Sequence, residues 1–161
     1  MANLHQIFYQ QLNQELAVAN TLHKLLCEER ELLDPPKIEA LSELQEHKQE
    51  QLILLQQLTQ QRCQWLENHQ IPLDKHCYKH PLLQTDSDID NDKLAALWQQ
   101  LADIFIENRR LTDMLSTIVL SARQKTQSLM KILRGQKNAP NLYDKSGQAS
   151  ATPRGVGYAK A

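Results

Sequence analysis

The first hydrophobic pattern along the chain is a stripe that begins near the N-terminus. Apolar side chains recur there at steps of three and four residues, and this spacing places them on one side of an α-helix. We therefore predict a first helix over about residues 3–33. Its recurring apolar positions are Leu4, Phe8, Leu12, Leu16, Ala19, Leu22, Leu26 and Leu33.

The segment "DPPK" at residues 34–37 separates this helix from a second one. Proline has no backbone N–H and disfavours the helical conformation in the residue before it, so the first helix should end here. Asp34 is a suitable N-cap for the next helix, with Pro35 at its first position. We predict the second helix over residues 36–68, antiparallel to the first because the connection is short. Its apolar positions are Ile38, Leu41, Leu44, Leu52, Leu55, Leu58 and Leu66.

Residues 69–89 interrupt the helical period. Pro72, Pro81 and the polar residues that follow Thr85 favour a long connection. We expect one short helical turn around "LDKHCYKH", residues 73–80, and we expect the chain to cross back over the bundle here.

A third helix is predicted over residues 90–134. Twelve positions from Leu94 to Ile132 follow alternating steps of three and four residues, and ten of them are apolar. The two exceptions are Asn108 and Lys125, and polar residues in such a seam can fix the register or the partner at a cost in stability. Gly135 is a suitable C-cap for this helix.

These elements define an all-α fold, a long antiparallel helical hairpin plus a longer third helix in a coiled-coil-like three-helix bundle. At about 1.5 Å per residue the third helix spans about 65 Å, whereas the first two span about 45 to 50 Å each. We therefore expect the C-terminal part of the third helix to lack cover. The apolar residues of this part are Ile118, Val119, Ala122, Leu129, Ile132 and Leu133.

An exposed apolar stripe usually marks a partner site, and an amphipathic helix of another protein would complete the missing layer. Two other arrangements stay open on periodicity alone. The connection or a bend of the bundle can cover the stripe within one chain, or two copies of the chain can cover it by self-association.

The last 27 residues, 135–161, differ from the rest because they hold all four glycines. They also carry four Lys or Arg residues against one Asp, so this tail is basic and the preceding body is acidic. A segment rich in Gly, Ser, Ala and Pro buries too little apolar surface to order itself. We predict a bundle over 1–134 and a flexible tail over 135–161.

Composition excludes several classes of protein. With 161 residues, 41% hydrophobic and 23% charged, the chain is suited to one folded domain. A net charge of −1 argues against a nucleic-acid binder. Neither a membrane span nor a signal peptide is recognisable, so we expect a cytoplasmic protein with no membrane insertion. Three cysteines without a framework spacing fit reduced thiols.

Candidate chemistry is confined to the connection, where His69, His76, Cys77 and His80 lie close together. Their spacing is not a zinc pattern, and adjacent residues such as His76 and Cys77 do not face each other on a helix. A phosphate-binding glycine loop is excluded because residues 1–134 contain no glycine. We expect no metal, no cofactor and no enzymatic activity.

The end of the chain resembles the FlgN family of flagellar export chaperones. Members of that family carry a Leu-Tyr pair soon after the last long helix, then an acidic or small residue, a Gly-Gln or Gly-Arg pair and a basic end. The resemblance extends to the length and helical layout of the whole chain. The matching residues are Leu142, Tyr143, Asp144, Gly147 and Gln148, with Arg154 and Gly155 beyond them.

The resemblance implies a chaperone that binds the C-terminal helical segments of hook-filament junction proteins, also called hook-associated proteins. Such a chaperone prevents their premature assembly and delivers them to the flagellar type III export gate. Leu142 and Tyr143 would dock on the gate. The residues expected to bind the substrate protein are Leu115, Ile118, Val119, Ala122, Leu129, Ile132 and Leu133.

Two alternatives come from other classes of protein. A structural coiled-coil protein would self-associate through the same stripe and exclude added partner helices. A metal-dependent enzyme or sensor would use His76, Cys77 and His80.

Overall fold

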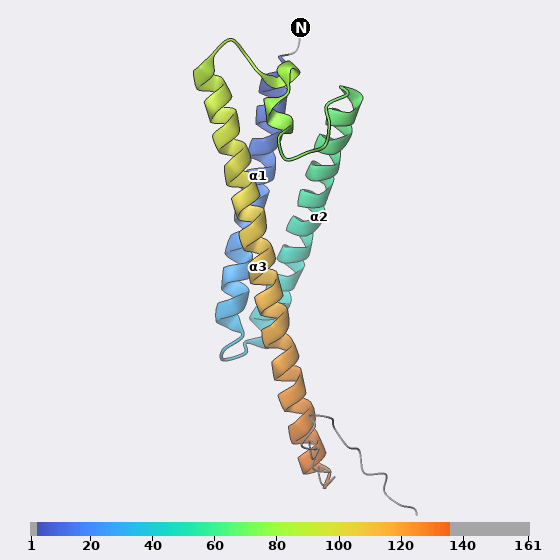
Figure 1. The fold of residues 1–161 in the computed structure, drawn as a ribbon. Helices are drawn as coiled ribbons and strands as arrows, with labels where there is room; N and C mark the ends of the chain where they lie inside the picture. The colour runs from blue at the N-terminus through green and yellow to red at the C-terminus, as the bar shows by residue number, and fades with distance from the viewer. Residues whose placement is uncertain (1–2, 136–161) are drawn as a thin grey trace, which may run out of the picture. The chain divides into compact units, whose positions relative to one another are not determined.

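The computed structural model describes residues 3–135, which form three long helices (Figure 1). They are α1 (Leu4–Leu32), α2 (Ile38–Asn68) and α3 (Asp88–Leu133). The connection between α2 and α3 contains two single turns of 3-10 helix, η1 (Cys77–Lys79) and η2 (Pro81–Leu83). No strand occurs in the described range, so the predicted all-α class with three helices is confirmed.

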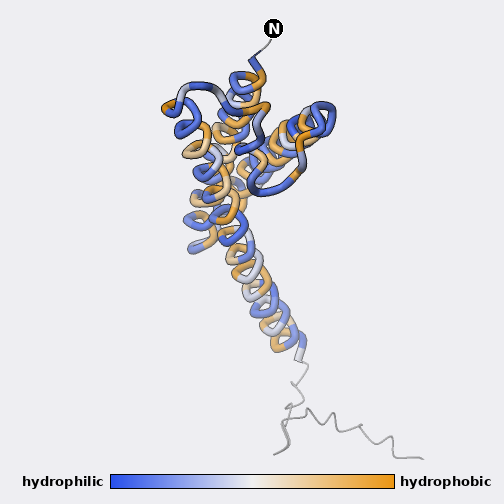
Figure 2. Tube along the Cα trace, turned by 45° about the horizontal axis from the view of Figure 1, so that its top comes forward, coloured by the Kyte–Doolittle hydropathy of each residue, from blue (hydrophilic) through white to orange (hydrophobic). Residues whose placement is uncertain are grey.

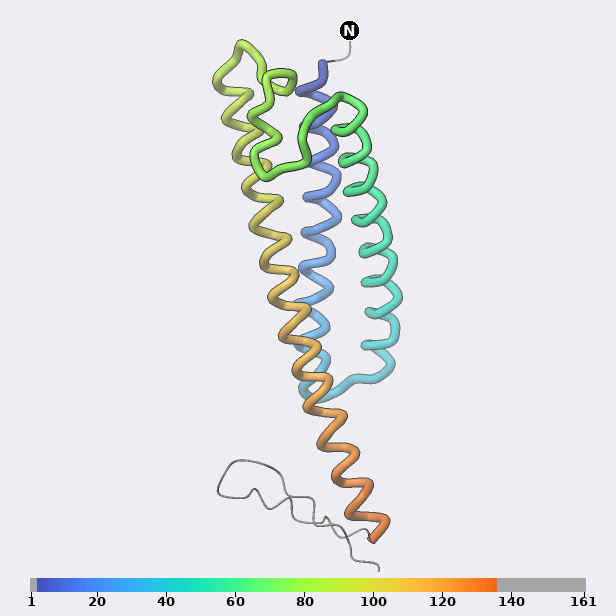
Figure 3. The backbone as a smooth tube through the Cα atoms, turned by 45° about the vertical axis from the view of Figure 1, so that its right-hand side comes forward, coloured from blue at the N-terminus to red at the C-terminus, as the bar shows by residue number. Residues whose placement is uncertain are grey.

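The chain divides into two compact units, one that ends at Ile118 and one that begins at Val119, and α3 contributes to both. Within the first unit, α1 and α2 run antiparallel, and the connection lies at the same end as the start of α1 (Figure 3). Hydrophobic and hydrophilic positions alternate along all three helices at the helical period (Figure 2).

Two clusters of buried apolar side chains make the core of the first unit. In the larger one, at the end near the connection, the Phe8 ring stacks between Trp65 and Trp98 at centroid distances of 6.0 and 6.1 Å. The second cluster consists of Leu22 and Leu26 from α1 and Leu111 and Leu115 from α3. The remaining buried members of the larger cluster are Leu12, Leu66, Ile71, Cys77, Leu83, Leu94, Leu97 and Leu101.

Two buried carboxylates of α1 hold α2 in register. Glu15 is 0% exposed, and it accepts hydrogen bonds from the guanidinium of Arg62 and, at 3.2 Å, from the Thr59 hydroxyl. Further along, the Glu29 carboxylate pairs with the Lys48 ammonium at 2.8 Å. A buried charge is tolerated only when it is paired and hydrogen-bonded, so these contacts fix how the two helices align.

Asn108 connects α3 to α1. Its side chain is 6% exposed, and its Nδ2 donates to the backbone carbonyl of Ala19 at 3.0 Å. Because a carbonyl only accepts, this bond orients the amide, and Oδ1 is left to accept from Nδ1 of His23, also at 3.0 Å. The polar interruption predicted at Asn108 therefore lies between two helices and sets their register.

The turn between α1 and α2 differs from the sequence prediction. The prediction of Asp34 as N-cap and Pro35 as first helical residue was wrong, because α2 begins at Ile38 with Lys37 as its N-cap. Pro36 disfavours the helical conformation at Pro35, so the helix cannot start there. The backbone N–H of Lys37 instead donates to the carbonyl of Leu32 at 3.0 Å and closes a tight turn.

The connection is fixed to the end of the bundle. His5 of α1 bonds the backbone carbonyl of Leu83 at 2.7 Å, and the indole N–H of Trp98 donates to the carbonyl of Lys75 at 3.0 Å. The short helical turn expected within residues 73–80 is present as η1, and η2 follows it as a second turn. Helix α3 begins two residues earlier than predicted, where the Ser87 hydroxyl accepts from the backbone N–H of Asp90.

None of the helices that the structure describes combines the length and the apolar character needed to cross a membrane.

Candidate functional site

The candidate site is the part of α3 that follows Leu115, because the exposure of the heptad seam changes there. From Leu94 to Leu115 the seam residues are buried or half-buried, whereas every residue from Ser116 to Gly135 is exposed. Among the large apolar side chains, the exposed fraction ranges from 36% at Ile118 to 84% at Leu133. These side chains are exposed, which is what the sequence led us to expect for this part of the helix.

The helical period gathers most of these side chains on one face. With about 100° per residue, Ile118, Leu129 and Leu133 lie near the centre of a face about 160° wide. Ile132 lies at one edge of this face and Met130 at the other. We call this surface the open face of α3, and it consists of Ile118, Val119, Ala122, Leu129, Met130, Ile132 and Leu133.

Six of the seven residues expected to bind a substrate protein belong to the open face. The exception is Leu115, which is 3% exposed because it packs against Leu22, Leu26 and Leu111 in the second core cluster. We therefore leave Leu115 out of the candidate site.

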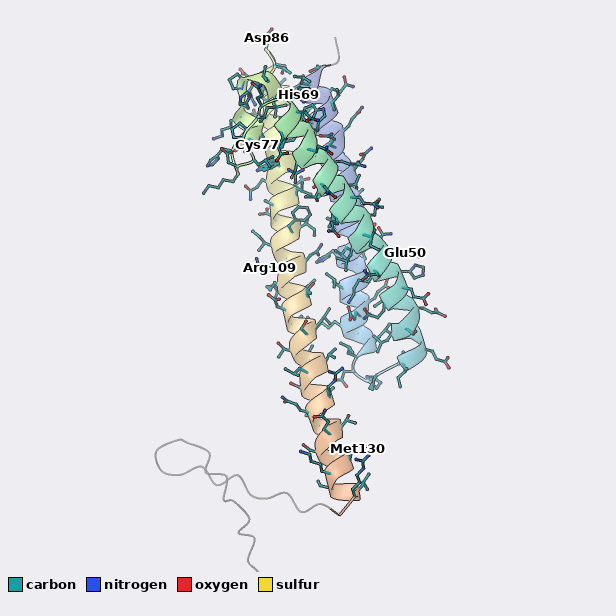
Figure 4. The ribbon with its side chains drawn as sticks, turned by 90° about the vertical axis from the view of Figure 1, so that its right-hand side faces the viewer. Glu50, His69, Cys77, Asp86, Arg109 and Met130 are labelled. Carbon is teal, nitrogen blue, oxygen red and sulfur yellow. The ribbon has the colours of Figure 1, made fainter. Side chains whose placement is uncertain are left out.

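Met130 extends the open face and was missed in the sequence, because it lies one step off the heptad seam (Figure 4). It is 45% exposed, and its unbranched side chain adapts to different partners. The sequence feature that could have identified Met130 is the width of the apolar arc, not the heptad seam. Leu142 and Tyr143, expected to dock on the export gate, lie outside the described residues.

The charge of this region is one-sided. From Met114 to Gly135 the sequence has four basic residues and no acidic one, whereas residues 1–113 have 10 Lys or Arg against 18 Asp or Glu. At about 100° per residue, Lys125 lies within the arc of the open face, Arg123 and Arg134 lie beside its edge, and Lys131 lies on the opposite side. The open face therefore combines apolar side chains with positive charge.

The histidines and the cysteine of the connection are not arranged as a metal site. Cys77, which Figure 4 labels, is buried in the larger core cluster, whereas the neighbouring His76 is exposed. Burial raises the pKa of the Cys77 thiol to about 11, so it stays protonated at neutral pH. His80 accepts through Nδ1 from the backbone N–H of Leu82. Among residues 3–135 no three His, Cys, Asp or Glu side chains are grouped to hold a metal ion.

Together these features define an all-α protein whose third helix carries an exposed apolar and basic stretch. The family comparison agrees with this class. The family model described as FlgN protein matches residues 1–151, and the chain therefore belongs to the FlgN family of flagellar export chaperones. This is a family of chaperones rather than enzymes, and its members bind flagellar hook-associated proteins. No curated protein and no solved structure gives a significant match.

Proposed function

We propose that this protein binds the C-terminal helical segments of hook-filament junction proteins on the open face of α3. The observation that carries the proposal is the change in the heptad seam. Its residues are covered up to Leu115 and exposed from Ile118 onward, although the apolar spacing continues to Ile132. An amphipathic helix from another protein fits such a seam, because it packs its own apolar side chains between those of the open face.

Binding in this way accounts for a chaperone activity without any catalytic step. A junction-protein segment covered by the open face is not available for assembly with other subunits. The activity needs no cofactor, metal or nucleic acid. The place of action is the cytoplasm, where the substrate is held before export.

Delivery to the flagellar type III export gate is assigned to the tail. Leu142 and Tyr143 form an apolar and aromatic pair, and a rigid aromatic residue is a common anchor of small interfaces. A version truncated after Arg134 should keep its affinity for the junction-protein segment and lose its affinity for the cytoplasmic part of the gate. Loss of segment binding on truncation would instead assign the tail to the substrate site.

The substrate site is tested by calorimetric titration of the full chain with C-terminal segments of junction proteins from the same bacterium. We expect one-to-one binding that Ile118→Asp and Leu129→Asp each abolish. Gln127→Asp is the matched control, because residue 127 lies opposite the open face, and it should bind like the unchanged protein. No binding by the unchanged protein would refute the proposal, and a dimer that excludes the segments would favour the self-associating coiled coil.

A further inference from the structure

The second polar residue of the heptad seam, Lys125, differs from the first in having no side-chain partner among residues 3–135. Asn108 is buried and bonded to His23 and Ala19 across α1 and α3. Lys125 is exposed, and it makes no ion pair within residues 3–135. Asn108 thus sets a register inside the bundle, whereas any counter-charge for Lys125 would come from outside residues 3–135.

The position of Lys125 favours such a counter-charge when the open face is covered. On the helical wheel it lies between Ile118 and Ile132, so a helix that covers the open face also covers the lysine stem. An ammonium group enclosed in an apolar interface without a counter-charge costs several kcal/mol. A shallow hollow beside it leaves room for an approaching side chain, and its lining residues are Ser121, Gln124, Lys125, Ser128, Leu129 and Ile132.

The charge of the region selects among possible occupants. Arg123, Lys131 and Arg134 add to Lys125, and no acidic residue lies between Met114 and Gly135. A second copy that presents the same stretch would bring these cations together, which costs free energy through like-charge repulsion. A partner helix with acidic side chains is attracted to the same surface.

We propose that the partner segment is an acidic amphipathic helix that carries one Asp or Glu within its apolar face, paired with Lys125. This inference rests on the proposed function, and it adds an explanation of which partner segments the open face selects. The apolar side chains of the open face provide affinity for many amphipathic helices. The pair at Lys125 selects the segment and the register in which it lies, because only one alignment brings the carboxylate to the ammonium.

The test is a charge-reversal experiment on the full chain. The probes are synthetic C-terminal segments of junction proteins from the same bacterium, each with one Asp or Glu at a time replaced by Lys. Lys125→Glu should weaken binding of the natural segment about 30-fold or more. Lys131→Glu makes the same charge change on the opposite side of the helix, and it should weaken binding only about threefold or less.

One Lys-substituted segment should bind Lys125→Glu more tightly than the natural segment does, and this rescue identifies the paired carboxylate. Equal losses for Lys125→Glu and Lys131→Glu, or a selective loss that no substituted segment rescues, would overturn the inference and leave the proposed function standing. If no natural segment binds the unchanged protein, the proposed function itself fails. Circular dichroism of each variant confirms that the helices are retained.

Discussion

The buried pair of Glu15 and Arg62 offers a direct test of what holds the hairpin together. In Arg62→Met the methionine keeps the apolar stem and removes the charge, so the Glu15 carboxylate, 0% exposed, loses its counter-charge. Thr59 remains as a donor at 3.2 Å, but a hydroxyl does not neutralise a carboxylate. Arg62 also lies over the Trp98 ring at 5.4 Å, and this contact is lost as well.

The expected cost is large relative to the stability of a protein of this size. Breaking a buried ion pair from one side costs about 3–5 kcal/mol, whereas a domain has a free energy of unfolding of about 5–15 kcal/mol. The double variant Glu15→Leu with Arg62→Met removes both charges and should unfold with a free energy within about 1 kcal/mol of the unchanged protein. Urea unfolding followed by far-ultraviolet circular dichroism measures both quantities.

Arg110→Met is the matched control, because the Arg110 guanidinium pairs with Glu107 on the surface of α3. It makes the same substitution at an exposed ion pair, and it should leave the unfolding midpoint unchanged. A double variant as unstable as Arg62→Met alone would refute the reasoning. The pair would then stabilise the hairpin in its own right, beyond avoiding an unpaired buried charge.

Three further predictions concern the core and the connection. Leu115→Ala should lower the free energy of unfolding by about 2–4 kcal/mol, whereas Leu129→Ala should leave it unchanged in the same urea titration, because only Leu115 is buried. Asn108→Leu should lower it by about 1–3 kcal/mol, because the hydrogen bonds of the Asn108 side chain to the Ala19 carbonyl and to His23 are lost, and a midpoint equal to that of the unchanged protein would exclude a role in register. Burial raises the pKa of Cys77 in the folded state from 9.0 to about 11. The thiol therefore contributes to the free energy of unfolding below pH 9, and this contribution is lost as the pH rises toward 11. Cys77→Val should flatten that part of the curve of unfolding free energy against pH, and identical curves for the two proteins would contradict the raised pKa.

The sequence predicted the helices well because the helical period of apolar residues is long and regular in α1 and α3. Helix lengths follow directly from residue counts, and they led us to expect the exposed residues at the end of α3. Helix lengths locate the start of the exposed part of α3 only to within about one helical turn. Whether Leu115 is covered depends on how far Leu22 and Leu26 reach along α3, which is a matter of packing rather than of length.

The buried charged residues of α1 could have been predicted from the helical period, but the prediction followed apolar residues alone. The buried positions of α1 from Phe8 onward keep alternating steps of four and three residues, and Glu15 and Glu29 occupy two of them. The prediction followed Leu16 because it is apolar, although Glu15 kept the period. A polar or charged residue in register with a buried seam is therefore a signal of a cross-helix contact, as Glu15 is in α1 and Asn108 is in α3.

The start of α2 was mispredicted for a local reason. Asp34 and Pro35 have the composition of a helix N-terminus, but the second proline changes which conformations the first can adopt. The two turns of the connection are set by contacts with α1 and α3 instead. His5 and Trp98 hold backbone carbonyls of that segment, and no local pattern encodes these bonds.

The continuity of α3 has a consequence for the kinetics of partner exchange. If partner segments bind the open face as proposed, they meet a helix that is already formed, so the conformational entropy lost on binding falls almost entirely on the partner segment. Only the partner segment then has to become helical on association, because α3 is already helical. Differences in affinity among partner segments should accordingly appear mainly in their dissociation rates, and a segment that leaves the open face recovers its chain entropy at once.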